Sequence, residues 1–133
     1  MKRRDWWEQL DAVLTRYQSA TFIRGQSDCL TLCLDAVESM TERDLFRDQR
    51  GYRSKTAAIK RGRALGFSSM GDGFASEMEE IHPVKAGRGD IAIIRDGKED
   101  AGGVFVGAQI VSMGRAGMWS VPRSRAVRAF KVI

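Results

Sequence analysis

Residues 25–33 form the segment Gly25-Gln26-Ser27-Asp28-Cys29-Leu30-Thr31-Leu32-Cys33, in which a glycine-bearing turn runs into an apolar helix. Asp28 or Ser27 is suited to cap this helix, and the apolar residues that follow recur at helical spacing over about 29–40. Cys29 then opens the helix, where unpaired backbone N–H groups and the helix dipole stabilise negative charge. We expect these groups to lower the pKa of the thiol and to be available to an oxyanion, as in cysteine hydrolases.

A thiol nucleophile needs a general base, and the only histidine of the chain is His82. His82 precedes Pro83 in a loop ahead of a predicted strand, so we interpret it as an ordinary loop residue rather than as the base. Two interpretations of Cys29 stay open: a half-buried small apolar residue, which we favour, and a reactive thiol. Cys33, one helical turn further on, is assigned to the core.

The segments around this helix predict an α+β fold. Helices are expected at 5–18, 29–40 and 56–65, with Ser54 as the cap and Gly66 as the terminator of the third, and a short helix at about 73–80. Short strands are expected at 91–94, 104–106, 109–111 and 127–132, with a turn at Asp96-Gly97. Helices followed by strands predict N-terminal helices packed on a C-terminal antiparallel sheet or small open barrel. We expect one domain over 1–133, with a helical part at about 1–80 and a strand part at about 87–133.

The composition is that of a globular domain able to bury a core without a metal or a disulfide. The chain has 133 residues, of which 43% are hydrophobic and 29% charged. No apolar run reaches the roughly 18 residues of a membrane span, and no apolar segment with a cleavage site follows the basic N-terminus, so we expect synthesis in the cytosol. Cys29 and Cys33 lie four residues apart on one helix without nearby histidines, which favours two free thiols and no zinc site. No cofactor is expected.

The net charge is +5, with a sequence pI of about 9.6. Such a charge permits contact with nucleic acid but does not establish it. The basic residues concentrate in 55–63 and 123–131, which we interpret as solvated faces of a helix and a strand. Nucleic acid is therefore not favoured as a partner.

Four short motifs in a fixed order resemble the NlpC family of papain-like cell-wall cysteine peptidases, and above all a branch of small phage and prophage proteins. They are a Gly-x-x-Asp-Cys motif at Gly25 to Cys29, a polar turn at Thr41-Glu42-Arg43-Asp44, the segment Arg50-Gly51-Tyr52, and a Gly-Asp strand at Gly89-Asp90-Ile91-Ala92-Ile93-Ile94. The resemblance covers the chain from about residue 20 to its end. It implies a papain-like (NlpC-type) fold with Cys29 at the nucleophile position.

The chain departs from this family at the expected base. Aligning residues 101–107 with the His-Val-Gly strand of active members places Ala101 at the catalytic histidine, and the next strand offers Ser112 where a polar residue orients that histidine. Neither side chain is a base near neutral pH, so Cys29 would be a vestigial or weak nucleophile.

The resemblance, taken with this loss, implies a phage or prophage virion protein: a component of the tail tip or hub that is a pseudoenzyme. Its expected partners are other phage tail proteins. It would be made in the host bacterial cytoplasm and carried in the virion. The alternative is an active cysteine hydrolase that cuts peptidoglycan peptides with Cys29 as nucleophile and peptidoglycan as partner.

Overall fold

The computed structural model describes residues 1–133 and has four α-helices followed by six strands. The helices are α1 (Trp6–Gln18), α2 (Cys29–Thr41), α3 (Lys55–Ala64) and α4 (Met70–Ala75). The strands are β1 (Glu79–Ile81), β2 (Ile91–Asp96), β3 (Glu99–Phe105), β4 (Gln109–Gly114), β5 (Gly117–Pro122) and β6 (Ala126–Lys131). This arrangement confirms the predicted α+β class. None of the helices is both long and apolar enough to cross a membrane.

Side-chain caps mark where α2, α3 and α4 begin, whereas α1 has none. Asp28, Ser54 and Ser69 each accept a hydrogen bond from the backbone N–H three residues further on, and each is followed by a helix. Past the last turn of α3, Gly66 adopts a φ of +91°, which favours glycine. All three longer helices lie within one residue of their predicted bounds, and Asp28 rather than Ser27 is the cap of α2.

The six strands form one open antiparallel sheet in the order β1-β6-β2-β3-β4-β5, with β1 and β5 at its free edges. Gly97, with a φ of +66°, turns the chain between β2 and β3, as the Asp96-Gly97 pair predicted. Asp90 precedes β2 and accepts hydrogen bonds from the backbone N–H groups of Gly87 (2.8 Å) and Val132 (3.0 Å). The carboxylate thus joins the start of β2 to the end of the chain.

Two elements differ from the prediction. The short helix expected at about 73–80 is α4 at Met70–Ala75, and the residues after it form the edge strand β1 against β6. Strand β5, at Gly117–Pro122, was not predicted at all. Strand β1 pairs with the distant β6 and β5 with the preceding β4, and neither shows a clear alternation of buried and exposed residues.

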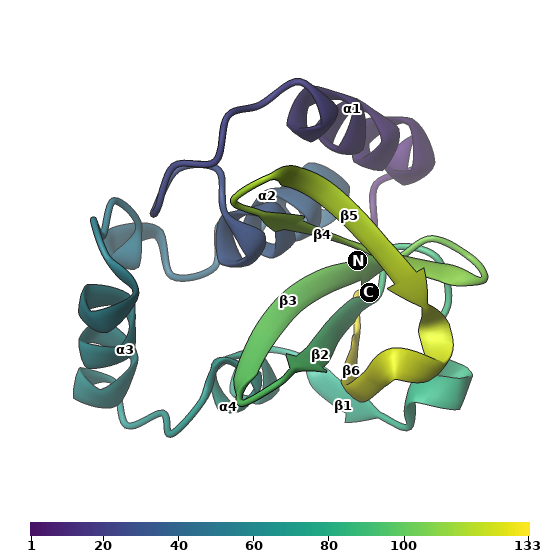
Figure 1. Ribbon diagram of the computed structural model, residues 1–133. Helices are drawn as coiled ribbons and strands as arrows, with labels where there is room; N and C mark the ends of the chain where they lie inside the picture. The colour runs from purple at the N-terminus through teal and green to yellow at the C-terminus, as the bar shows by residue number, and fades with distance from the viewer.

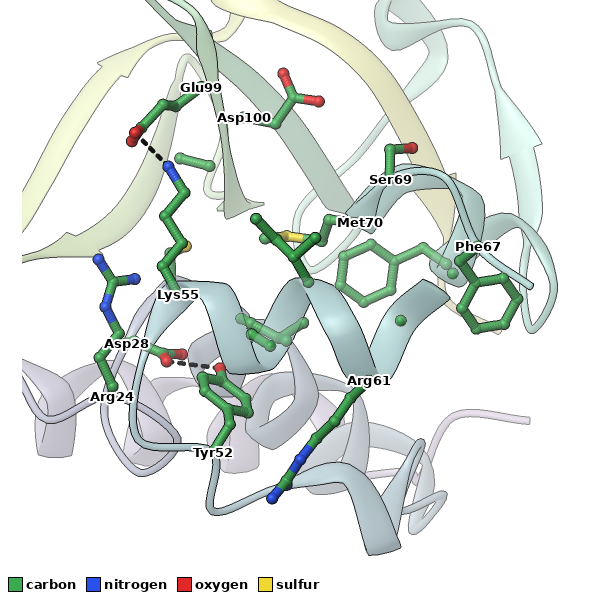
Figure 2. A pocket seen from close by; sticks show the side chains of 18 of the residues that line it. Arg24, Asp28, Tyr52, Lys55, Arg61, Phe67, Ser69, Met70, Glu99 and Asp100 are labelled. Atoms are coloured by element: carbon green, nitrogen blue, oxygen red, sulfur yellow. Dashed lines mark hydrogen bonds and ion pairs between the residues drawn. The ribbon is translucent and has the colours of Figure 1, made fainter. Parts of the chain in front are cut away.

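The helices cover one face of the sheet unequally (Figure 1). Helix α2 packs directly on β3 and β4, and α1 packs outside it. Helix α3 stands apart from the sheet and contains no buried residue. Its first residue, Lys55, reaches across to Glu99 at the start of β3 (Figure 2). The space between α3 and the sheet is where the candidate site lies.

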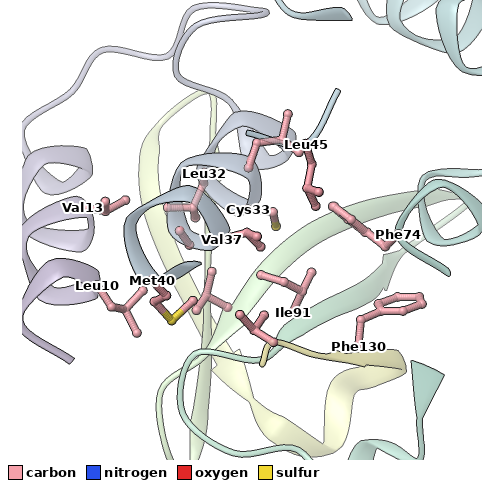
Figure 3. Close-up of a cluster of buried hydrophobic side chains, with 14 of the residues drawn as sticks. Leu10, Val13, Leu32, Cys33, Val37, Met40, Leu45, Phe74, Ile91 and Phe130 are labelled. Carbon is pink, nitrogen blue, oxygen red and sulfur yellow. The ribbon is translucent and has the colours of Figure 1, made fainter. Parts of the chain in front are cut away.

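The main core lies between α2 and the sheet (Figure 3). Side chains of α1, α2, α4, β2 and β6 meet there, among them Leu10, Leu32, Val37, Met40, Phe74, Ile91 and Phe130, all at most 1% exposed. A smaller apolar cluster, which includes Ala92, Ile94, Phe105 and Ile110, occupies the opposite face. The sheet is therefore buried on both faces, and α2 is held with its first residue at the rim of the core.

Arg128 of β6 joins two separate parts of the chain through its guanidinium group. It donates to Asp72 of α4 at 3.0 Å and to both carboxylate oxygens of Glu80 in β1 at 2.8 and 2.9 Å. These contacts lower the pKa of Glu80, chiefly through the hydrogen bond. We expect Arg128→Met to reduce the free energy of unfolding by about 1 kcal/mol, whereas Arg125→Met changes it little.

The pH dependence of this effect has a defined sign. Because the pKa of Glu80 lies lower in the folded state than its ordinary 4.5, the stabilisation is complete above that value and is lost as the pH falls below it. Urea unfolding of both proteins at pH 7 and pH 3 measures this. A difference between them that stays constant down to pH 3 would contradict the assignment.

Candidate functional site

A cavity of about 790 Å³ opens between α3, the start of α2 and the ends of β2, β3, β4 and β5. About half of its lining residues are hydrophobic, including Phe22, Leu30, Ile59, Phe67, Met70 and Phe74. Cys29 and Ala101 both line it. The predicted nucleophile position is therefore at the wall of a cavity of the size that binds small molecules or peptide segments.

Asp28 fixes the start of α2 through a set of buried hydrogen bonds. Its side chain, 1% exposed, accepts from the N–H groups of Thr31 (2.8 Å) and Gly25 (2.9 Å) and from the hydroxyl of Tyr52 (2.6 Å; Figure 2). A reciprocal hydrogen bond runs from the Asp28 N–H to the Thr31 hydroxyl oxygen at 2.8 Å. The capping box and the Tyr52 contact together determine where Cys29 stands.

Burial raises the pKa of the Cys29 thiol and is the largest influence on it. A hydrogen bond from the Gly102 backbone opposes this, the nearby Asp28 carboxylate raises the pKa further, and Arg24 lowers it. The expectation that the helix start lowers this pKa is therefore wrong, because desolvation outweighs the N–H groups. Both cysteines are free thiols, as predicted, and Cys33 is fully buried with a pKa raised by its burial.

Gly102 rather than Ala101 is the residue of β3 that directly faces α2. A Cβ atom at Gly102 would lie 2.9 Å from the Cys33 sulfur and 3.2 Å from the Cys29 carbonyl oxygen. Adjacent strand residues point to opposite faces, so the Ala101 methyl group lies on the other face of β3. Neither position supplies a base.

Ser112 does not reach the cavity. It is fully buried, and its hydroxyl donates to the Gly102 carbonyl oxygen at 2.6 Å. The side chain thus joins β4 to β3 where their regular pairing has ended. It cannot orient a group in the cavity while it makes this bond.

No imidazole lines the cavity. His82 is exposed in the loop after β1, where its Nδ1 accepts a hydrogen bond from the Val84 N–H at 3.1 Å. This confirms its assignment as a loop residue. No group of three or more histidine, cysteine, aspartate or glutamate side chains is arranged to hold a metal ion.

Several cavity residues were not singled out by sequence reasoning as site residues. Tyr52 appeared only as part of a motif, and Lys55 only as part of a solvated helix face, yet both line the cavity. Glu99, the first residue of β3, and Arg115, in the turn between β4 and β5, also line the cavity. The only local signal for this site was the Asp28-Cys29 pair. The contact between Tyr52 and Asp28 could not be predicted, because it depends on how the loop before α3 folds back onto α2.

Two comparisons with known proteins add to this description. No curated protein matches the chain significantly. A family described as a domain of unknown function (DUF6950) matches residues 1–132. Because this match spans nearly the whole chain, the protein belongs to the DUF6950 family.

Proposed function

We propose that the protein is a phage or prophage virion component, at the tail tip or hub, built on an NlpC-like cysteine peptidase fold that has lost its catalytic base. The observation that carries the proposal is that Cys29 opens a helix at the wall of a cavity in which no imidazole is present. The order of the motifs supports the NlpC-like origin, and the α+β arrangement is compatible with it.

The charge state of the thiol supports a non-catalytic role. A nucleophilic cysteine needs a lowered pKa or an adjacent base, and Cys29 has a raised pKa and neither Ala101 nor Ser112 to take its proton. Without thiolate or base, hydrolysis through Cys29 would be slower by orders of magnitude. The geometry that once served turnover would then serve folding and binding.

Assembly into a particle is tested by complementation in a strain that carries the gene. After deletion of the gene, we expect wild-type protein and Cys29→Ala to restore infectious particles equally, and an antibody to detect both proteins in purified tails. The fold of the variant is checked by thermal unfolding of the purified protein. Cys29→Ala leaves Asp28 and its hydrogen bonds in place, so it removes only the thiol.

Two outcomes would overturn this proposal. If the protein is absent from purified particles and its deletion leaves their infectivity unchanged, it is not a virion component. If a folded Cys29→Ala protein is incorporated but fails to restore infectivity, the thiol performs chemistry and the hydrolase alternative is favoured.

A further inference from the structure

Three cationic side chains from separate segments act on one carboxylate of the cavity lining, that of Glu99. Lys55, at the start of α3, forms an ion pair with Glu99 of β3 (Figure 2). Arg24, before α2, and Arg115, in the turn between β4 and β5, also line the cavity and both lower the pKa of Glu99. Glu99 has a side chain 68% exposed, so this cluster faces solvent.

The cavity lining as a whole has more positive than negative side chains. Seven Lys or Arg side chains and four Asp or Glu side chains line the cavity, a surplus of three positive charges. Glu99 is paired with Lys55, and Asp100 is paired with Arg95. Arg24 and Arg115 have no ion-pair partner; Arg24 instead lies over the ring of Phe22, 4.9 Å from its centre.

On the α3 side, the cavity is lined by apolar side chains that are partly exposed to solvent. Ile59 and Leu65 lie there and are each 46% exposed. They have no place in the core, because α3 contributes no buried residue to it. The cavity lining therefore combines cationic side chains with apolar surface.

We propose that this cavity binds a peptide segment with acidic and apolar side chains, whose carboxylate takes the place that Glu99 now holds among Arg24, Lys55 and Arg115. The group already held by the cluster is a carboxylate, and the apolar wall suits aliphatic side chains. Aromatic side chains of the lining, such as Phe22 and Phe67, could also stack on nucleobases, so the test below includes an oligonucleotide. This inference does not depend on assembly into a virion, because it concerns only the ligand class of the cavity.

Cys29 provides a reporter inside the cavity. Two thiol reagents of similar size and opposite charge, sulfonatoethyl and trimethylammonioethyl methanethiosulfonate, are compared at low salt, and each rate is divided by the rate with glutathione. Both reagents react with the same fraction of thiolate, so the ratio of their normalised rates reports only the local charge around Cys29. We expect the anionic reagent to be favoured by about tenfold, and by much less at 0.5 M NaCl.

Variants assign the preference to the cluster. We expect Arg24→Gln combined with Arg115→Gln to remove the preference, and Glu99→Gln to increase it. Lys60→Gln removes a cation of α3 that is exposed outside the cavity, so it should leave the ratio unchanged. The variant Cys29→Ala measures background labelling of Cys33. A ratio near one in the wild-type protein, or one unaffected by the double substitution, would overturn the proposal.

A second measurement tests the peptide itself. The peptide acetyl-Leu-Glu-Leu-Glu-Leu-amide at millimolar concentration should slow the modification of Cys29 by a neutral disulfide reagent. Its Gln counterpart, acetyl-Leu-Gln-Leu-Gln-Leu-amide, should slow it at least several-fold less. If neither peptide protects the thiol, the peptide assignment is wrong. If a twelve-nucleotide oligothymidylate protects Cys29 and the Glu peptide does not, the cavity binds nucleic acid and the proposal is wrong.

Discussion

Replacing Asp28 with alanine is expected to lower the free energy of unfolding by about 4 kcal/mol, a large part of the stability of a domain of this size. Loss of the helix cap accounts for about 1 kcal/mol. The Tyr52 hydroxyl and the Gly25 N–H would each lose a buried acceptor, which costs about 1–3 kcal/mol per group. Urea unfolding followed by circular dichroism measures the change.

Tyr52→Phe separates these contributions. It removes the donor together with the need for an acceptor and leaves the capping box intact, so we expect a loss of only about 1–2 kcal/mol. In the background of Asp28→Ala, Tyr52→Phe should cost little or even stabilise, because the orphaned hydroxyl is gone. Equal and additive losses for the two substitutions would contradict the account of a shared buried bond.

Gly25→Ala is expected to destabilise the protein by about 3 kcal/mol and to displace the Asp28-Cys29 turn. Gly25 has a φ of +79°, which costs an alanine about 1–2 kcal/mol. Its Cβ would lie 2.3 Å from the Tyr52 carbonyl oxygen and 2.8 Å from the Tyr52 nitrogen, so the backbone must move. Thermal unfolding and the labelling rate of Cys29 measure the two effects.

Gly51→Ala is the matched control for this substitution. Gly51 has a similar φ of +81°, but no atom lies within 4 Å of the position of its Cβ. It should therefore show only the backbone cost of about 1–2 kcal/mol. Equal losses for Gly25→Ala and Gly51→Ala would show that the close approach of the Tyr52 backbone does not matter.

Local signals explain how far the fold could be predicted from the sequence. Helices α2 and α3 were predicted within a residue because Asp28, Ser54 and Gly66 mark helix ends through contacts within a few residues. Helix α1, which has no side-chain cap, was predicted from its apolar spacing alone. Strand β2 was predicted from its apolar run. Strands β1 and β5 depend on partners elsewhere in the sheet and left no local pattern.

The candidate site was predictable only in part. The sequence placed Cys29 at the start of a helix, and the structure confirms that position. It could not show that burial would raise the pKa of the thiol, because burial depends on β3 and on the loop before α3. Nor could it show that Lys55 and Glu99, 44 positions apart in the chain, form an ion pair across the cavity.

The pH dependence of Cys29 alkylation tests the central claim most directly, namely that this thiol has no base. The rate with iodoacetamide is measured from pH 6 to pH 10, with Cys29→Ala as background. We predict a single rise with a midpoint above the ordinary cysteine value of about 8.5, because burial is the largest influence on the pKa of Cys29. A midpoint well below 8 would show an activated thiolate and contradict the account.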